Sequence, residues 1–407
     1  MWKISLSDLR LTPDDHAAVM EALQSNWLTM GPRTADFEQL FAEALDPIAP
    51  PYAFAVSNCT VGLHMAFVAA GIGPGDEVIV PTLTFVATAN AVLYTGATVV
   101  LADVTSAEDL TISVDDVIAK FTPRTRAVVP VHYAGQPCDM VRLRRECRLR
   151  GVAIIEDNAH GPLADAWMDD DGRVQALGTI GEIGCFSFFS NKNMATGEGG
   201  MVVTRDKALA DKLRLLRSHG MTTLTLERHR GHAYSYDVVE EGFNYRIDEL
   251  RAALGISQLA RLPENNRKRA EVVAGYIQRL RELPGVVVPF ADRLPQGRTA
   301  HHIMPIQLPI GVARHAVQEA MKEAGIQTSL HYPPVHSFTH HRHSDRVRKD
   351  ELQLVDSIAD RMLTLPLYPG LSDKDLDLVV RSLANSIAHA RKISDLSASS
   401  VVGGGAQ

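Results

Sequence analysis

A single lysine stands directly after an apolar stretch, where burial of its ammonium group would be costly. Lys192 follows the run GCFSFF (184–189) and comes shortly before the glycine-rich turn GEGG (197–200). One interpretation is a surface lysine on a loop. The other is a lysine that works as a neutral amine, because burial at a strand end lowers the pKa of an amine. Such an amine can act as a nucleophile or form a Schiff base.

Two carboxylates close a second apolar run, AIIED (153–157), and His160 follows three residues after Asp157. A buried carboxylate is costly unless a cation or hydrogen-bond donors compensate its charge. Asp157 therefore needs a cationic partner if it is buried at the strand end. A carboxylate that caps the start of a helix explains the pattern equally well.

Polar and aromatic residues follow two further apolar runs. Ser57, Asn58 and Thr60 come after AFAVS and predict the start of a helix, whose free N–H groups could hold a phosphate. Phe85 comes after EVIVPT, where it could stack on a flat ring. Taken alone, the first pattern is explained by a plain helix cap and the second by core packing.

Short apolar runs alternate with amphipathic stretches from about residue 53 to 245, which predicts a mostly parallel sheet covered by helices on both faces. Seven runs are expected to be its strands: AFAVS (53–57), EVIVPT (77–82), VVLAD (99–103), AVVPVH (127–132), AIIED (153–157), GCFSFF (184–189) and GMVVT (200–204). In such sheets ligands bind at the carboxyl ends of the strands, which is where the residues above stand.

The remaining sequence suggests a division of the chain into four parts. Residues 1–50 are expected to be an N-terminal helical segment, 51–260 a large α/β domain, 261–393 a smaller C-terminal α+β domain and 394–407 a flexible tail. The fold class is therefore α/β, with a smaller α+β domain appended.

One cofactor requires these features in this chain order. Pyridoxal 5'-phosphate needs four features: a phosphate-binding helix start (the phosphate cup), an aromatic ring to stack on, an aspartate on a strand end and then a lysine. The aspartate would keep the pyridine nitrogen protonated so that the ring acts as an electron sink. The lysine would hold the aldehyde and move a proton, and an imine nitrogen carries no permanent ammonium charge to bury.

From about residue 4 to 390 the chain resembles the sugar aminotransferases of the DegT/DnrJ/StrS type. The matching stretches are NWLTMGP (26–32), GIGPGDEVIVPTLTFVATANAV (71–92), VHYAGQP (131–137), IIEDNAHG (154–161), FSFFSNKN (186–193), GEGGMVVT (197–204), GFNYRIDELRAALG (242–255) and HYPPVH (331–336). The resemblance implies fold-type I of the pyridoxal phosphate enzymes. It also implies that Lys192 forms the internal aldimine, that Asp157 pairs with the pyridine nitrogen, that His160 lies near the 3′-hydroxyl and that Phe85 stacks on the ring.

The same resemblance assigns a phosphate cup and a shared site. Thr60, the backbone of Val61 and Ser187 match the cup, and Asn244 matches an asparagine that reaches the phosphate from the partner subunit of a homodimer. Cys59 stands where the family usually has glycine, which makes close approach of the phosphate tighter. His331 and Thr29 lie in matching stretches and are the candidates for substrate contact.

The implied activity is transfer of an amino group from glutamate or glutamine to a keto-sugar, most often a nucleotide-linked one. An aminocyclitol aminotransferase of the same family is the first alternative. A second branch of the family carries histidine in place of the lysine and dehydrates its sugar, but lysine stands at 192 here. A non-enzymatic paralogue is disfavoured because Lys192, Asp157 and Ser187 are all present.

Bulk composition narrows the class of protein. The 407 residues are 45% apolar and 22% charged with a formal net charge of −7, which favours a globular protein and disfavours partners such as nucleic acid or an anionic membrane. The four cysteines show neither CxxC nor zinc spacing, and no apolar run reaches the ~18 residues of a membrane span, so a cytoplasmic protein is expected. The histidine-rich stretch HSFTHHRHSD (336–345) is expected to be a solvated loop rather than a metal site, and the pair His301–His302 has no interpretable pattern.

Overall fold

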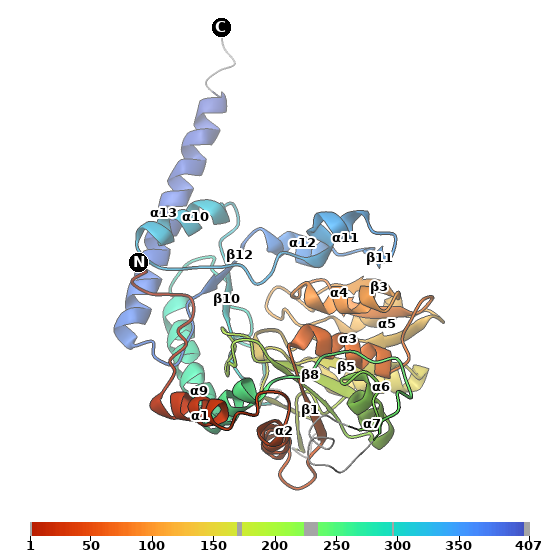
Figure 1. Cartoon of the computed structure of the whole chain (residues 1–407). Helices are drawn as coiled ribbons and strands as arrows, with labels where there is room; N and C mark the ends of the chain where they lie inside the picture. Colours follow the sequence, from red (N-terminus) through yellow and green to blue (C-terminus); the bar gives the residue numbers. More distant parts are fainter. Residues whose placement is uncertain (1, 169–172, 224–234, 295–296, 403–407) are drawn as a thin grey trace.

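The computed structural model describes residues 2–168, 173–223, 235–294 and 297–402. One half of the molecule is built around a large sheet, and a smaller sheet with its own helices lies beside it (Figure 1). The strands of the large sheet are β1 (Tyr52–Val56), β2 (Glu77–Pro81), β3 (Thr98–Ala102), β4 (Thr125–Val128), β5 (Ala153–Asp157), β8 (Ile183–Ser187), β9 (Gly200–Thr204) and β11 (Val347–Arg348).

The strand order of the large sheet is β1-β9-β8-β5-β4-β2-β3-β11. All seven strands predicted from the sequence are present, and β11 adds a short eighth strand from the C-terminal part of the chain. The pairings from β8 through β5, β4, β2 and β3 to β11 are parallel, whereas β9 runs antiparallel to both β8 and β1. The prediction of a mostly parallel α/β sheet is confirmed.

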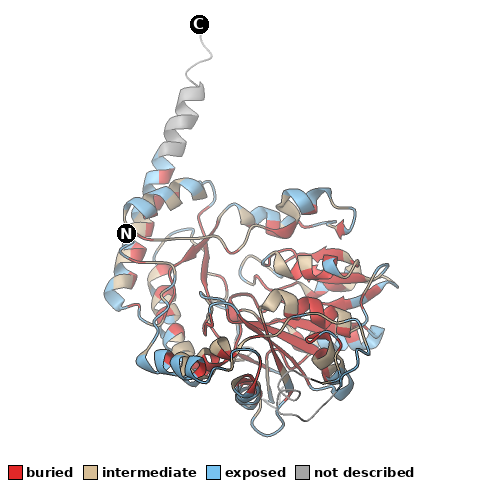
Figure 2. Ribbon diagram, viewed as in Figure 1, coloured by how far each residue is buried: buried red, intermediate tan, exposed pale blue. Residues whose placement is uncertain are grey.

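Helices cover both faces of this sheet, so most strand residues are buried, and β2, β8 and β9 are buried from end to end (Figure 2). The covering helices are α3 (Cys59–Ala69), α4 (Ala87–Tyr94), α5 (Val114–Lys120), α6 (Met140–Arg150) and α7 (Lys207–Leu216). Successive strand residues point to opposite faces, so Val78 packs with α3, α4 and α7 while Ile79 packs with α5 and α6. This two-sided burial explains why the strands are continuous apolar runs in the sequence.

The N-terminal helices pack against the edge of the sheet and against a long connecting helix. These elements are α1 (Pro13–Gln24), α2 (Pro32–Leu45) and α9 (Glu249–Leu280). Thr12 caps α1 in a reciprocal capping box with Asp15. Phe37 and Phe41 of α2 form an aromatic cluster with Phe186 and Phe188, which fixes the end of β8.

The second half of the molecule is built around a two-stranded antiparallel sheet. It contains β10 (Met304–Gln307), β12 (Met362–Leu365), α10 (Arg314–Glu323) and α13 (Asp373–Val402), which pack with the C-terminal part of α9. A separate hairpin is formed by β6 (Asp165–Trp167) and β7 (Val174–Ala176). Helix α13 continues through residues 394–402 of the segment expected to be a flexible tail, and residues 403–407 lie outside the described residues.

A C-terminal segment returns to the large sheet. It contains β11 together with α11 (Thr339–His343) and α12 (Gln353–Ala359), and Val335, Val347 and Val355 join the core beside α4. His336 contacts Thr82 Oγ1 at 2.7 Å, and the histidine-rich stretch thus packs on the sheet instead of forming a purely solvated loop. Among the described helices, none is long and apolar enough to cross a lipid bilayer.

The connection between β8 and β9 runs over residues 188–199 and contains no helix, because antiparallel neighbours need no crossover. It carries Lys192, whose N–H donates to the carbonyl of Phe189 at 2.8 Å, and it is closed by a bridge between Phe189 and Gly197. Gly200 then begins β9 directly against the peptide that joins Asn58 to Cys59. The lysine loop is therefore held by strands on both sides and lies beside the start of α3.

Gly200→Ala tests this close approach. The added methyl group would lie 2.8 Å from backbone atoms of Asn58, Cys59 and Phe186, so the backbone must shift. We expect the free energy of unfolding to fall by about 1–3 kcal/mol, as in other overpacked sites, measured by urea denaturation. Gly73→Ala is the matched control, since the space around Gly73 is open. Equal stability of the two variants would contradict the packing described here.

Candidate active site

Three strands that run in the same direction bring the predicted residues to one edge of the sheet. β5 and β8 are parallel, and β1 has the same direction because both β1 and β8 are antiparallel to β9. Their carboxyl ends therefore meet at a cavity of about 660 Å³. Eight predicted site residues line it: Thr60, Val61, Phe85, Asp157, His160, Ser187, Lys192 and His331.

Two predicted residues lie elsewhere on the same chain. Thr29 and Asn244 are exposed and are not among the residues that line this cavity. Asn244 forms an isolated bridge with Ser218, ahead of the start of α9. The single chain therefore brings together the lysine, the aspartate and the candidate cup, but neither Thr29 nor Asn244.

Lys192 is half-buried, and its amine lies in a site with few compensating charges. Desolvation lowers the pKa of Lys192 to about 8, while the negative charge of Asp157 opposes this shift. Its Nζ lies 3.4 Å from Nε2 of His302. A substantial fraction of the amine is therefore neutral near physiological pH, as a nucleophile requires.

Asp157 is 6% exposed and is held by two donors. Thr88 Oγ1 donates to Asp157 Oδ2 at 2.8 Å, and the N–H of Ala159 donates to Oδ1 at 3.1 Å. Burial raises the pKa of Asp157, and these hydrogen bonds together with the charge of Lys192 oppose the rise. A cationic group bound in the cavity would stabilise the ionised carboxylate further.

The neighbouring carboxylate, Glu156, has a different environment because successive strand residues face opposite sides. Its oxygens accept 2.7 Å hydrogen bonds from the N–H groups of Gly178, Ile180 and Gly181. His132 Nε2 lies 2.9 Å from the same carboxylate. Glu156 therefore anchors the loop ahead of β8, whereas Asp157 faces the cavity.

The start of α3 forms one end of the cavity. Asn58 caps the helix, its Oδ1 accepting from the N–H of Val61 at 3.0 Å and its carbonyl accepting from the N–H of Gly62 at 3.3 Å. The earlier N–H groups, those of Cys59 and Thr60, are the ones that a bound anion could use without disturbing the cap. Cys59 occupies the usual glycine position and its side chain lines the cavity.

A wall of neutral rings forms the opposite side. Nδ1 of His160 accepts from the N–H of Ala134 at 3.2 Å, so the ring proton lies on Nε2 and donates to Tyr332 Oη at 2.8 Å. Burial lowers the pKa of His160 well below its ordinary value, consistent with this neutral tautomer. Phe85 lies 5.6 Å from the ring of Tyr332. The whole cavity can thus accept a planar molecule with an anionic end at α3 and a basic nitrogen at Asp157.

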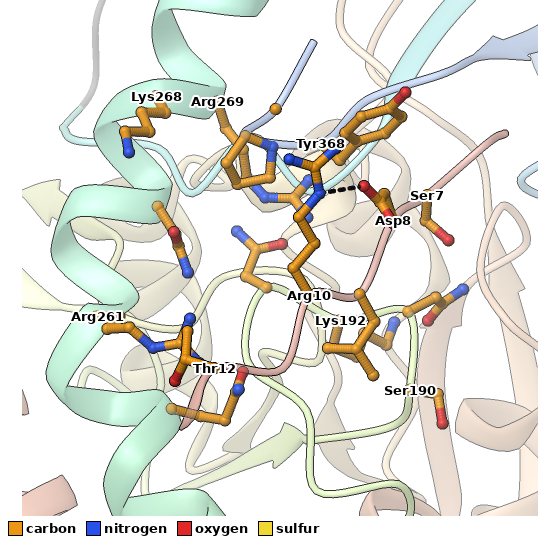
Figure 3. A pocket seen from close by; sticks show the side chains of 17 residues that line it. Ser7, Asp8, Arg10, Thr12, Ser190, Lys192, Arg261, Lys268, Arg269 and Tyr368 are labelled. Carbon is orange, nitrogen blue, oxygen red and sulfur yellow. Dashed lines mark hydrogen bonds and ion pairs between the residues drawn. The ribbon is translucent and has the colours of Figure 1, made fainter. Parts of the chain in front are cut away.

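A second cavity, of about 290 Å³, shares Asn191 and Lys192 with the first and is otherwise lined by different residues (Figure 3). Arg261, Lys268 and Arg269 of α9 line it, and Arg10 enters from the N-terminal segment, where it pairs with Asp8 at 2.6 Å. Lys192 therefore lies on the boundary between a cavity lined by aromatic and polar groups and one rich in basic groups.

Three contributors were missed in the sequence. Thr88 lies within a matching stretch and Tyr332 follows His331, so adjacency to recognised motifs was an available signal for both. His302 had no such signal, because its place beside Lys192 depends on the packing of α9 and β10 against the lysine loop.

Known proteins are similar to this chain over most of its length. The model of the DegT/DnrJ/EryC1/StrS aminotransferase family matches residues 10–384. The spore coat polysaccharide biosynthesis protein SpsC of Bacillus subtilis (strain 168) is 38% identical over 379 residues, which are 91% of this chain and 94% of SpsC.

Two solved structures extend the comparison to the fold. The aminotransferase TlmJ from Streptoalloteichus hindustanus has a TM-score of 0.84 at 34% identity, covering 95% of this chain and 99% of TlmJ. The sugar aminotransferase CalS13 from Micromonospora echinospora has a TM-score of 0.81 at 30% identity, covering 94% and 99% of the two chains. These matches confirm the resemblance indicated by the motifs and the fold-type I architecture.

The pKa of Lys192 can be measured in the cofactor-free protein. We expect half-maximal labelling of Lys192 by an amine-reactive reagent near pH 8, followed by peptide mass spectrometry, against about 10.4 for an unperturbed lysine. In Asp157→Asn the midpoint should move lower, because the charge that favours the ammonium form is lost. A wild-type midpoint near 10 would contradict the desolvated environment described here.

Proposed function

The chain belongs to the DegT/DnrJ/EryC1/StrS aminotransferase family, and on that premise we propose that it transfers an amino group from glutamate or glutamine to a nucleotide-linked keto-sugar. The observation that carries this proposal is the cavity in which the lowered-pKa amine of Lys192 faces the buried carboxylate of Asp157. The names of SpsC and CalS13 refer to polysaccharide biosynthesis and to sugar amination, which supports a sugar substrate.

Enzymes of this family depend on pyridoxal phosphate, and the residues of the cavity fit that cofactor. The start of α3 offers N–H groups to a phosphate, with Ser187 beside it, and Asp157 offers a carboxylate to a ring nitrogen. Phe85 and His160 provide flat surfaces for a ring. When bound, the cofactor supplies an electron-withdrawing ring that stabilises negative charge on the reacting carbon of the substrate.

The residues of this chain then have separate tasks. Lys192 would hold the cofactor and, as a free amine, would take the proton from the α-carbon of the amino donor. Asp157 would keep a proton on the ring nitrogen, and the hydroxyl of Thr88 holds the carboxylate in place at 2.8 Å. His160 and Tyr332 form a neutral, hydrogen-bonded wall that limits water at the reacting atoms. For the sugar, the same proton movements run in the opposite direction.

Lys192→Ala should abolish amino transfer while leaving the fold intact, because the covalent link and the proton carrier are both lost. In the wild type, borohydride reduction should fix the cofactor to the peptide that contains Lys192, identified by mass spectrometry. Lys207→Ala is the control, since Lys207 is an exposed lysine that pairs with Asp211. Label on any other lysine would show the assignment to be wrong.

A matched panel of acceptors then identifies the substrate class. Nucleotide-linked keto-sugars should return the aminated cofactor to its aldehyde form, followed by absorbance, whereas free keto-cyclitols should not. The reverse preference would identify an aminocyclitol aminotransferase, and release of water from the sugar would identify a dehydratase. Absence of any cofactor absorbance in the purified protein would favour a non-enzymatic role.

The second cavity supports a substrate that carries phosphate groups. Arg10, Arg261 and Lys268 pair with Asp8, Asp15 and Glu264, whereas Arg269 donates to backbone carbonyls. The four cations thus outnumber their three carboxylate partners next to Lys192, and a diphosphate linker is the part of a nucleotide-linked sugar that this net positive charge would attract. Free keto-cyclitols carry no such group. This observation favours nucleotide-linked substrates over the first alternative.

The double substitution Arg10→Gln with Lys268→Gln tests the phosphate contact. We expect KM for a nucleotide-linked keto-sugar to rise about three- to tenfold, because each partly exposed ion pair contributes about 0.2–1 kcal/mol. The KM for glutamate should stay unchanged, and so should the fraction of the cofactor that glutamate converts to the aminated form. Arg267→Gln is the control, because Arg267 is exposed on the same helix but does not line the cavity. Equal KM values in the double variant and the control would remove this cavity from substrate binding.

Assembly as a homodimer with shared sites is the remaining part of the proposal. Phe85 and Tyr94 line the large cavity and yet are 56% and 61% exposed, which is an unusual state for aromatic side chains and is typical of an interaction surface. Asn244 lies outside the cavity of its own chain, as expected of a residue supplied to the other subunit. A two-fold axis would create two equivalent composite sites.

Mixing two inactive variants tests the shared site. In a mixed dimer of Lys192→Ala and Asn244→Trp, one site collects both defects and the other collects none. Activity should return to about a quarter of wild type if subunits exchange at random, since half of the dimers would carry one intact site of two. If mixed dimers form and activity stays at zero, Asn244 acts within its own chain.

A further inference from the structure

A buried histidine that the reaction described above does not use lies directly behind the catalytic amine. His302 is 4% exposed, and its Nε2 lies 3.4 Å from Nζ of Lys192. Its ring lies 4.4 Å from the ring of His160, which belongs to the wall of the large cavity. Because β10 of the small sheet begins two residues after it, His302 contacts the amine from the small-sheet half of the molecule.

The hydrogen bonds around Asn193 determine which nitrogen of His302 carries the proton. Asn193 Nδ2 donates to Asn266 Oδ1 at 2.8 Å and to the carbonyl of Ala300 at 2.6 Å. Asn266 is itself oriented, because its Nδ2 donates to the carbonyl of Pro162 at 3.0 Å. The amide oxygen of Asn193 must then be the atom that faces His302.

That oxygen lies 3.0 Å from Nδ1 of His302 and can only accept a hydrogen bond. The ring proton of His302 is therefore on Nδ1, and Nε2 presents a lone pair to the amine of Lys192. A second proton on this ring would place two cations within 3.4 Å of each other. Burial, followed by the charge of Lys192, lowers the pKa of His302 well below its ordinary value, so the ring stays neutral.

The backbone of His302 is held as firmly as its ring. Its N–H donates to the carbonyl of Ala134 at 2.9 Å, and its carbonyl accepts from Arg269 Nη1 at 3.2 Å. The other titratable groups around this pair are Cys59, Asp157, His160, Arg269 and His331. Among them, only Asp157 carries a negative charge when Cys59 is a thiol, and it faces Lys192 from the cavity side.

We propose that His302 is a positioning residue for Lys192: its Nε2 accepts a hydrogen bond from the amine whenever Lys192 is not linked to the cofactor. The released amine borders two cavities, and without this acceptor it could rotate into the basic one, away from the reacting carbon. His302 keeps it on the side where it moves the proton and recaptures the cofactor. The inference rests on the proposed function, in which Lys192 is the working amine.

Two amide substitutions separate positioning from a merely structural role. In His302→Gln the amide oxygen can take the place of Nε2 and still accept from Lys192, but the contact with Asn193 is altered. In His302→Asn the shorter amide takes the place of Nδ1, so it keeps the contact with Asn193 and loses the one with Lys192. If His302 had a merely structural role, His302→Gln would be the more damaging change. If His302 positions Lys192, His302→Asn is the more damaging change.

The readout is the pH dependence of Lys192 labelling in the cofactor-free protein. Loss of an acceptor destabilises the ammonium form, so the labelling midpoint in His302→Asn should fall by about one pH unit below wild type. In His302→Gln it should stay within a few tenths of a unit. Rates of cofactor recapture by Lys192, followed by absorbance, should fall about tenfold in His302→Asn alone. Equal midpoints in all three proteins, or a larger shift in His302→Gln, would overturn the proposal.

A structure of the wild-type protein with pyridoxamine phosphate gives an answer that does not depend on how the variants fold. Lys192 is free in that complex, and its Nζ should lie within hydrogen-bond distance of His302 Nε2. An amine turned into the basic cavity would overturn the inference. These tests are separate from the test of the proposed function. Borohydride label on another lysine would contradict the proposed function. Label on Lys192 together with an unchanged labelling midpoint in His302→Asn would contradict only the role of His302.

Discussion

The site is organised around the burial of an amine beside a carboxylate. Desolvation favours the neutral form of Lys192 and equally favours the protonated form of Asp157, while the attraction between the two groups works against both shifts. The balance leaves an amine with a pKa of about 8 and a carboxylate that needs donors. Thr88 and Ala159 supply those donors, and a cationic group in the cavity would stabilise the carboxylate further.

The sheet makes this balance possible because it holds both groups from rigid elements. Asp157 ends β5 and Lys192 lies in the connection from β8, the strand next to β5. The antiparallel strand β9 allows that connection to turn back without a covering helix, and it also positions the start of α3 through the close approach at Gly200. The antiparallel strand β9 thus helps to position Asp157, the loop that carries Lys192 and the start of α3.

Neutral rings complete the electrostatics of the cavity. His160, His302 and His331 are all buried, and burial lowers the pKa of each, that of His331 to about 4. They offer hydrogen bonds without adding positive charge next to Lys192, which would depress its basicity further. The positive charge of the region is instead concentrated in the separate basic cavity, where Arg269 and its neighbours line the far side of the lysine loop.

Sequence alone indicated the strands, the family and most of the residues that the fold brings together around one cavity. Strands that are buried on both faces are nearly continuous apolar runs, so all seven predicted strands could be found in the sequence. Asp157 and Lys192 could be found as well, because a charged residue at the end of such a run is costly to bury without a partner. The capping signal at Asn58 was equally readable, because a cap and its helix are close in sequence.

Contacts between distant segments were decided only by the tertiary structure. The pairing of β11 with β3 joins residues about 250 positions apart, and neither its two-residue length nor its composition predicts a strand. His302 reaches Lys192 across 110 positions, and its tautomer depends on Asn193, the neighbour of Lys192 in the same loop, and on Asn266 of α9. Such roles have no local pattern, because the hydrogen bonds that define them form only after the two halves of the molecule have packed together.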